Sequence, residues 1–549
     1  MVRMTDIRYI LVLLAGVVLT NWMGRVLGDR VALPLIQVAV GAAIGSVTSL
    51  GAPLKPDQFF LIFLPPLLFF DGWRVSKTDL AANAPLILSM ALGLVVVTVG
   101  CVGLMLHWLI PVMPLAVCFA LAAVLSPTDV VAAGAVARHI PIPRGVLRLL
   151  EGEALFNDAA ALICLRLAIA AVVTGTVPVL DSLAAFVWAA GGGIAIGIAF
   201  SWMVATAKAF MVRRVGEDTS GQILISLLIP YGAYLLAEAA GSSAVLAAVA
   251  AGMMMSRIEV SGRALPLTRL RRGAVWETLQ FTLNGVMFLL LGEQMPGILS
   301  GAARSIAEGG HHAVGWLGLY VAATVLALAA LRFAWVLAAL CCWPAGRGQS
   351  GAPRAFPRWR LVAVMAFGGV RGAVTLAAAL SLPLVLTGGM PFPARDLAVF
   401  IAAAVILVSL ALANVALPIL LRGIDLPLDP ADAAQEREAR AEALQAALDA
   451  LAEAAEAQTA DADAPTVAAI VADHYRHRLD QLQAEGVDGG TAAWPEERRM
   501  HLLAIQAERR SIVSLVQRRR IPIDLAHKLL RETDAEEVAL PVAPGMGEG

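Results

Sequence analysis

Three carboxylates fall inside one largely apolar stretch of the chain, EGEALFNDAAAL at residues 151–162. They belong to Glu151, Glu153 and Asp158, and the strongly apolar run ICLRLAIAAVV follows at once. A charge at mid-membrane costs on the order of 2.5–3.5 kcal/mol even on the lenient insertion scale, so such residues are functional candidates by default. Carboxylates in that setting either pair with a buried cationic side chain or bind a hard ion such as Na⁺ or Li⁺, or a proton.

Two further charges lie in segments that cannot form regular helices. Asp129 stands in AAVLSPTDVVAAGAV, where Pro127 removes a helix donor and frees backbone carbonyls near Thr128. Arg371 stands in MAFGGVRGAVTLAAAL, where closely spaced glycines weaken the helix. Interrupted helices at membrane depth are tolerated only where they line a cavity or pack against protein, and a matched pair of them indicates a transporter site. We therefore predict that these two segments cross at mid-membrane.

The spacing within residues 151–162 separates two faces of one helix. Glu153 and Asn157 are four residues apart and share a face, whereas Asp158 points about 100° away from Asn157. We predict that Glu153 pairs with Arg371, which neutralises both charges. Asp158 then faces Asp129 and the oxygens of Thr128, a hard ligand set that suits Na⁺ or Li⁺.

Other charges at membrane depth are given simpler interpretations. We expect Glu151, Glu238 and Glu277 to reach the membrane interface from helix ends, and we interpret Glu277 and Arg332 as packing residues.

The elements that position these residues follow from composition. The chain has 549 residues, of which 59% are hydrophobic and only 15% are charged, against roughly a quarter in soluble domains. A net charge of −1 argues against nucleic acid as a partner. We predict an all-α membrane protein with about thirteen transmembrane helices, near residues 9–27, 31–49, 57–73, 83–108, 113–137, 150–174, 181–206, 223–240, 243–256, 275–295, 313–343, 360–386 and 396–421.

Loops on one side of the predicted membrane hold most of the lysine and arginine residues, and the loops on the other side hold few. Because basic loops stay in the cytoplasm, this predicts an external N-terminus and a cytoplasmic C-terminus in a multi-pass protein of the cell (inner) membrane. The interrupted helices are the fifth and the twelfth. They occupy equivalent places if the first six and last six helices are inverted repeats joined by the seventh. Residues 426–549 are rich in Ala, Glu and Arg and predict a cytoplasmic helical tail. A solvated surface is the simplest interpretation of its charges, and regulation or dimer contact is the alternative.

Five segments in order resemble the signatures of the cation:proton antiporter-1 family, the NhaP-type sodium/proton exchangers, over about residues 8–422. They are FLPPLLFFDGW, SPTDVVAAGAV, EGEALFNDAAAL, YLLAEAAGSSAVLAAVAAG and GGVRGAVTLA. The resemblance implies an NhaA-like antiporter fold and a homodimer. In a transmembrane domain of residues 1–425, it implies core helices at 83–174 and 313–421, dimerisation helices at 9–73 and 223–295, and a linker helix at 181–206.

The resemblance also implies roles for particular residues. Asn157 and Asp158 correspond to the family's ion-site pair, with Asp158 as the carrier of ion and proton. Glu153 and Arg371 correspond to its structural salt bridge, and Thr128 and Asp129 to its crossing-helix residues. Asp71 occupies the acidic position near the ion entrance.

The expected function is electroneutral exchange of one Na⁺ or Li⁺ for one H⁺ by alternating access, with no cofactor and no enzymatic activity. A K⁺/H⁺ antiporter of the same fold is the alternative, and a cation channel is more remote. The sequence disfavours an intramembrane aspartyl protease, because the usual YD and GxGD contexts of its aspartates are missing. The expected partners are membrane lipid, a second copy of the chain and regulatory contacts of the tail.

Overall fold

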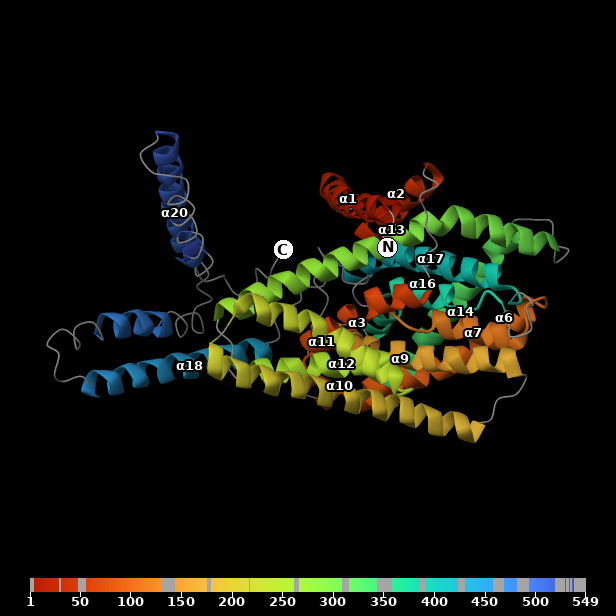
Figure 1. The fold of residues 1–549 in the computed structure, drawn as a ribbon, viewed down its shortest axis with the longest axis horizontal. Helices are drawn as coiled ribbons and strands as arrows, with labels where there is room; N and C mark the ends of the chain where they lie inside the picture. Colours follow the sequence, from red (N-terminus) through yellow and green to blue (C-terminus); the bar gives the residue numbers. More distant parts are fainter. Residues whose placement is uncertain are drawn as a thin grey trace. The chain divides into compact units, whose positions relative to one another are not determined.

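The computed structural model describes residues 4–28, 31–47, 56–129, 144–174, 179–216, 218–260, 266–308, 315–342, 358–385, 392–422, 430–457, 469–480 and 493–518, with the single residues 529, 533, 536 and 537. Contacts within the chain divide it into two compact units, Met1–Ile424 and Asp425–Gly549. The described secondary structure is helical in both (Figure 1).

The first part of unit Met1–Ile424 is a series of apolar helices in the order that the sequence predicts. They are α1 (Met4–Val26), α2 (Leu33–Val47), α3 (Pro56–Arg74), the short α4 (Lys77–Ala82), the continuous helical run α5 (Ala84–Leu88), η1 (Ser89–Gly93) and α6 (Leu94–Leu109), then α7 (Leu115–Leu125), α9 (Arg144–Thr174) and α10 (Val179–Val215).

The rest of the unit continues with α11 (Thr219–Ala239), α12 (Ala244–Val260), α13 (Pro266–Glu308), α14 (Gly315–Cys342), α15 (Arg358–Phe367), α16 (Ala373–Leu380) and α17 (Arg395–Leu421). In Figure 1, α13 runs along one side of this unit and α10 along the opposite side, with α9 and α12 between them.

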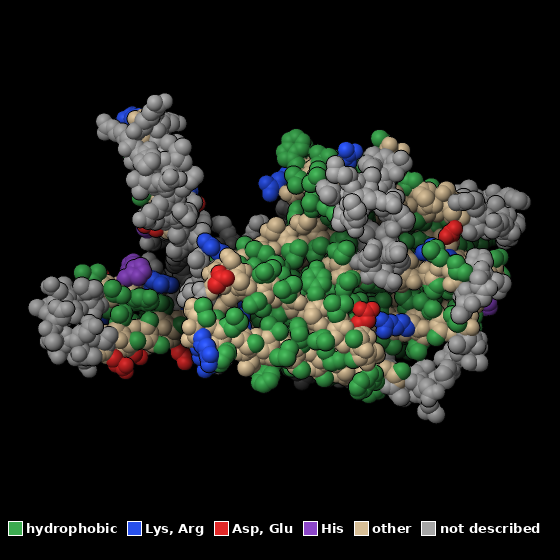
Figure 2. All heavy atoms as spheres, in the orientation of Figure 1, with side chains coloured by type: hydrophobic (Ala, Val, Ile, Leu, Met, Phe, Trp, Pro, Cys, Tyr) green, Lys and Arg blue, Asp and Glu red, His purple; other side chains and the backbone are tan. Residues whose placement is uncertain are grey.

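Length and composition support a membrane-spanning unit. Eight of the described helices are long and apolar enough to cross a membrane unaided. Many large apolar side chains lie on the outside, and Figure 2 shows hydrophobic side chains spread over the face of the helical unit. Trp188 and Trp202 on α10, for example, are 60% and 59% exposed. Such a surface is stable against lipid tails but not against water. The all-helical membrane fold is therefore confirmed, whereas the count of thirteen spans stays a prediction.

Both predicted interruptions are present. Helix α7 ends at Leu125, and Ser126–Asp129 are not helical. Between α15 and α16, residues 368–372 leave the helical path. The rest of the predicted fifth span, residues 130–137, lies outside the described residues. The helices are thus interrupted at the proline and at the glycines, as the sequence predicts.

Glycine allows unusually close helix pairs in this unit. A Cβ atom on Gly41 of α2 would lie 2.1 Å from the carbonyl oxygen of Leu289 in α13, and one on Gly292 of α13 would lie 2.0 Å from that of Val38 in α2. Helices in lipid gain little from hydrophobic burial against one another, so close backbone approach at small residues is a principal source of their association. The pair α2–α13 is held in this way.

Unit Asp425–Gly549 contains the predicted tail helices. Helix α18 (Pro430–Ala457) covers the Ala- and Glu-rich run, residues 469–480 form a further helix, and α20 (Ala493–Gln517) covers the segment that begins at PEERRM. The predicted linker at 458–465 and the break at 486–490 lie outside the described residues, as does most of the IDLAHKLLRE segment. The division of residues 1–425 into core and dimerisation helices stays a prediction.

Candidate functional site

A cavity of about 460 Å³ collects most of the predicted site residues. Asp71 of α3, Asp129 after α7 and Asp158 of α9 all line it, together with Thr128. The remaining lining residues are Leu67, Leu68, Arg74, Val75, Pro127, Leu147, Glu151, Ala154, Leu155, Gln280, Asn284, Met287, Gly372, Val374 and Thr375. The side chain of Arg74 is exposed, so the cavity reaches the protein surface at the end of α3.

The two interrupted helices meet beside this cavity, as predicted. The backbone N–H of Asp129 donates to the carbonyl oxygen of Val370 at 2.7 Å. Arg371 donates from Nε to the carbonyl oxygen of Leu125, the last residue of α7, at 3.1 Å, and from a terminal nitrogen to that of Gly369 at 2.8 Å. These bonds satisfy backbone groups that a broken helix leaves open, which lipid could not do.

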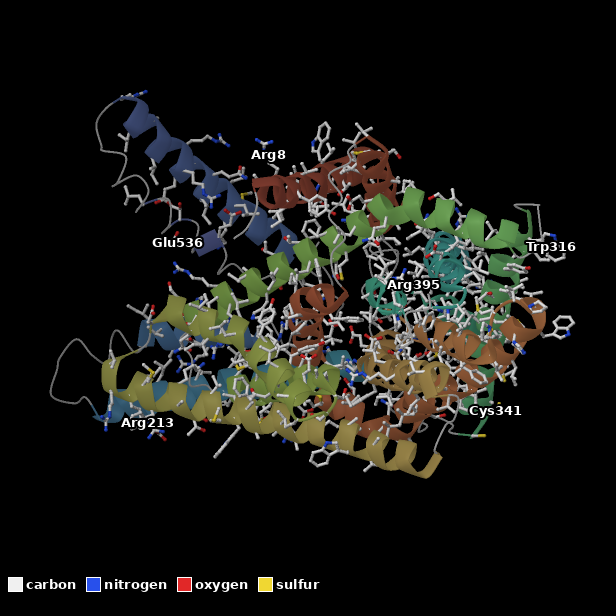
Figure 3. All side chains as sticks on the ribbon, turned by 45° about the vertical axis from the view of Figure 1, so that its right-hand side comes forward. Arg8, Arg213, Trp316, Cys341, Arg395 and Glu536 are labelled. Carbon is white, nitrogen blue, oxygen red and sulfur yellow. The ribbon has the colours of Figure 1, made fainter. Side chains whose placement is uncertain are left out.

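Arginines also donate hydrogen bonds to carbonyl oxygens at the C-terminal ends of α15 and α16. Arg332 donates from Nε to the carbonyl oxygen of Met365 near the end of α15 at 3.0 Å. Arg395, which lies at the start of α17 (Figure 3), donates to the carbonyl oxygens of Leu380 and Leu382 at 3.1 and 2.9 Å. Carbonyl ends of helices carry partial negative charge, which a guanidinium neutralises while it donates. The negative ends of α7, α15 and α16 are therefore all turned toward arginine.

The N-terminal end of α16 lies against Asp129 in a space that only glycine leaves free. Gly372 is the residue before the helix, and a Cβ atom there would lie 1.6 Å from the Oδ2 atom of Asp129. The positive end of α16 is thus next to a carboxylate, which is the favourable arrangement for a helix N-terminus.

Gly372→Ala is therefore expected to displace the Asp129 carboxylate and to lower both transport and the thermal unfolding temperature. The backbone of Gly372 has a φ of −122°, which alanine adopts freely, so the cost comes from the side-chain clash. Gly100→Ala is the matched control, since nothing lies within 4 Å of a Cβ atom at that position. Parent-like transport and melting of Gly372→Ala would contradict the close approach.

A buried hydrogen-bond chain stands next to the cavity. The amide nitrogen of Asn157 donates to the Thr128 hydroxyl at 2.9 Å, and that hydroxyl donates to Oε1 of Glu153 at 3.4 Å. Asn157 and Glu153 are each 1% exposed and Thr128 is 4% exposed. Accepting one bond leaves the Thr128 oxygen a second lone pair. Asn157 itself does not line the cavity, and its Oδ1 atom has no hydrogen-bond partner among the described residues.

The predicted salt bridge between Glu153 and Arg371 is wrong. Glu153 instead forms a two-pronged pair with Arg332 of α14, in which one guanidinium nitrogen lies 2.7 Å from Oε2 and the other binds Oε1. Both side chains are at most 2% exposed. Arg371 is buried nearby, and its side chain donates its hydrogen bonds to carbonyl oxygens. Arg332 is thus a structural partner of the site and more than the packing residue that we expected.

The sequence also missed polar residues that α13 contributes. Gln280 donates from its side-chain nitrogen to Oδ1 of Asp71 at 3.3 Å, and Asn284, one helical turn further on, lines the same cavity. Their spacing of four residues on an otherwise apolar helix face was the available signal. Glu151 was expected at the interface and lines the cavity near Arg74.

The arrangement suits a small hard cation or a proton. Carboxylates, the hydroxyls of Thr128 and Thr375 and side-chain amides supply oxygen atoms around a cavity that opens at one end, and the one sulfur atom in its described lining is the thioether of Met287. Arg332 forms an ion pair with Glu153, and Arg371 donates to the carbonyl oxygens of Leu125 and Gly369. Three other acids, Asp71, Asp129 and Glu151, line the cavity with Asp158, and neither Arg332 nor Arg371 is among the described lining residues.

Comparisons with known proteins agree with this chemistry. The family model described as "Sodium/hydrogen exchanger, transmembrane" matches residues 10–423. The chain is 37% identical over 547 residues to a protein of Escherichia coli (strain K12) named as the Na(+)/H(+) exchanger YjcE, covering 97% of this chain and 98% of that protein. It is 36% identical over 524 residues to a "Sodium, potassium, lithium and rubidium/H(+) antiporter" of Bacillus pumilus (strain SAFR-032), covering 95% and 76%.

Among solved structures, the sodium proton antiporter MjNhaP1 from Methanocaldococcus jannaschii has a similar fold. The TM-score is 0.56 at 16% sequence identity, and the match covers 76% of this chain and 99% of that one. At this identity the likeness concerns the fold.

Proposed function

Because this chain belongs to the sodium/hydrogen exchanger family of multi-pass membrane transporters, we propose that it exchanges Na⁺ or Li⁺ for H⁺ across the cell membrane, one ion for one proton. The observation that carries the proposal is the position of Asp158 on the wall of a water-accessible cavity, beside the crossing of two interrupted helices. Broken helices around a central site are the usual architecture of alternating-access transport.

The proposed cycle uses one carboxylate as a shared carrier. Na⁺ and H⁺ compete for Asp158, so that binding of either expels the other, and the helices that carry the site reorient only when it is occupied. Asp129 lies at the N-terminal end of α16, and Asp71 accepts a hydrogen bond from Gln280. We propose that the protonation state of these two acids does not change during the cycle, and that Asp71 and Thr128 guide the ion to Asp158. With Glu153 neutralised by Arg332, no net charge then moves.

The same site could serve K⁺/H⁺ exchange, and one finding favours this second candidate. The Bacillus pumilus relative carries potassium and rubidium in its name beside sodium and lithium. Ala154 on the cavity wall also leaves more room than a larger side chain would.

Purified protein in vesicles with an internal pH dye separates these alternatives. We expect Na⁺ and Li⁺ to dissipate an acid-inside gradient, and K⁺ to do so only if the second candidate is right. Clamping the membrane potential to zero with valinomycin and K⁺ should leave the Na⁺-driven rate unchanged, because no net charge moves. A clear rate change under this clamp, corrected for any transport of K⁺ itself, would mean that a second acid titrates, with Asp129 the first to test.

We propose an external N-terminus and a cytoplasmic C-terminus, which places the open end of the cavity, at Arg74, on the cytoplasmic side. A reporter fused after residue 422 should then be active in the cytoplasm, and an external signal would reverse the assignment. We also propose that the protein is a homodimer and that the tail regulates it. Cross-linking in native membranes tests the dimer, and deletion of residues 426–549 tests the tail.

A further inference from the structure

A second cavity lies outside the ion site, between α9, α10 and α12. Its volume is about 380 Å³ and its lining is almost wholly apolar: Phe156 from α9, Ile194 and Ile198 from α10, and Leu246, Val249, Ala250, Met253 and Met254 from α12. In Figure 1, α10 runs along α12 on the outside of the unit. Ile194 and Ile198 are 37% and 43% exposed, so this groove opens toward the membrane.

Two cations stand at one end of the groove. Arg257 lies in the last turn of α12 and is exposed, and Lys77 begins α4 directly after α3. Burial, and next the positive charge of Arg257, lower the pKa of Lys77. Neither side chain takes part in any ion pair among the described residues, as the acids nearest in sequence are engaged elsewhere: Asp79 with Arg148 at 3.3 Å, and Glu259 with Arg272. The groove thus ends in unneutralised positive charge.

We propose that this groove binds one anionic phospholipid, with an acyl chain between α10 and α12 and its phosphate on Lys77 and Arg257. The volume is in the usual range of ligand sites, roughly 300–1,000 Å³. Basic pockets between transmembrane helices recognise anionic lipid headgroups by charge. Methionines such as Met253 and Met254 adapt to irregular chains. A soluble anion would satisfy the cations but would leave the apolar groove unfilled.

The bound lipid would contact the helix that carries the ion site. Phe156 is the groove residue of α9, and it directly precedes Asn157 and Asp158 in the sequence. The site therefore places a lipid against α9 from the membrane side, opposite the aqueous cavity. Such a lipid site requires only a membrane-embedded protein and is independent of the ion that is transported.

Native mass spectrometry of the full chain, titrated with phosphatidylglycerol and with phosphatidylcholine, tests the proposal. The parent should bind one phosphatidylglycerol more tightly than any phosphatidylcholine. The double variant Lys77→Gln/Arg257→Gln should weaken that site roughly tenfold or more. Arg213→Gln/Arg214→Gln is the matched control, since it removes the same charge from exposed positions at the end of α10 (Figure 3) and should bind like the parent.

A second pair of variants tests the apolar half of the site. Ile198→Trp should fill the groove and remove the tight lipid, whereas Met203→Trp, on the exposed surface of α10 outside the groove, should not. Equal binding of the two lipids by the parent, or parent-like binding by both Lys77→Gln/Arg257→Gln and Ile198→Trp, would overturn the proposal. Displacement of phosphatidylglycerol by millimolar inorganic phosphate would also overturn it, because it would assign the cations to a soluble anion.

Discussion

Arg332→Ala is expected to reduce protein yield sharply and to lower the thermal unfolding temperature more than any other single change at the helix crossing. The substitution leaves the carboxylate of Glu153 buried without its cation, at 1% exposure, and breaking such a pair costs about 3–5 kcal/mol. It also removes the donor that satisfies the carbonyl oxygen of Met365. Melting curves of purified protein in detergent, with Arg332→Lys as a variant that keeps the charge, measure the effect.

A double-mutant cycle distinguishes this pairing from the alternative partner. Glu153→Gln combined with Arg332→Gln should recover part of the loss, because the two amides can bond to each other and no charge is stranded. Glu153→Gln combined with Arg371→Gln should show the smaller coupling, since Arg371 donates to the carbonyl oxygens of Leu125 and Gly369. Parent-like melting of Arg332→Ala, or stronger coupling to Arg371, would reject the pair.

Much of the fold follows from local chemistry and was predictable. Apolar runs of sufficient length give the spanning helices, and Pro127 and the glycines around Arg371 give the two interruptions because they act on their own backbone. The crossing itself was predictable from the same cause, since backbone groups freed at membrane depth must find partners inside the protein. The gathering of Asp71, Asp129 and Asp158 around one cavity followed from the resemblance and from the cost of leaving each in lipid.

The partner of Glu153 was not predictable in the same way. Arg332 and Arg371 both lie at membrane depth and either could pair with Glu153. The residues around each arginine in the sequence do not indicate which of them forms the pair. The choice depends on how α14 packs beside α9, and on the carbonyl oxygens at the broken helix ends, which attract Arg371 instead. The glutamine that contacts Asp71 was missed for a related reason: α13 reaches the cavity from a distant part of the chain.

Asp158→Asn is expected to reduce exchange to the background of protein-free vesicles in both directions, with either Na⁺ or Li⁺. The substitution keeps the shape of the side chain, so the variant should fold and melt like the parent, but it removes the only group that both ions are proposed to share. In the parent, direct competition predicts that the Na⁺ concentration for half-maximal exchange rises as the pH falls through the range in which the site takes up its proton.

Asp71→Asn is the matched control, because it makes the same chemical change on the same cavity wall, where Gln280 already binds one oxygen. It should slow exchange without abolishing it, since an acid near the entrance attracts the cation but does not carry it. The decisive measurement is ion-dependent dequenching of the pH dye at several pH values for the parent and for Asp158→Asn, Asp71→Asn and Asp129→Asn. If Asp158→Asn still exchanges ions above background while Asp71→Asn or Asp129→Asn does not, the carrier is another of the three acids, and the competition at Asp158 is rejected.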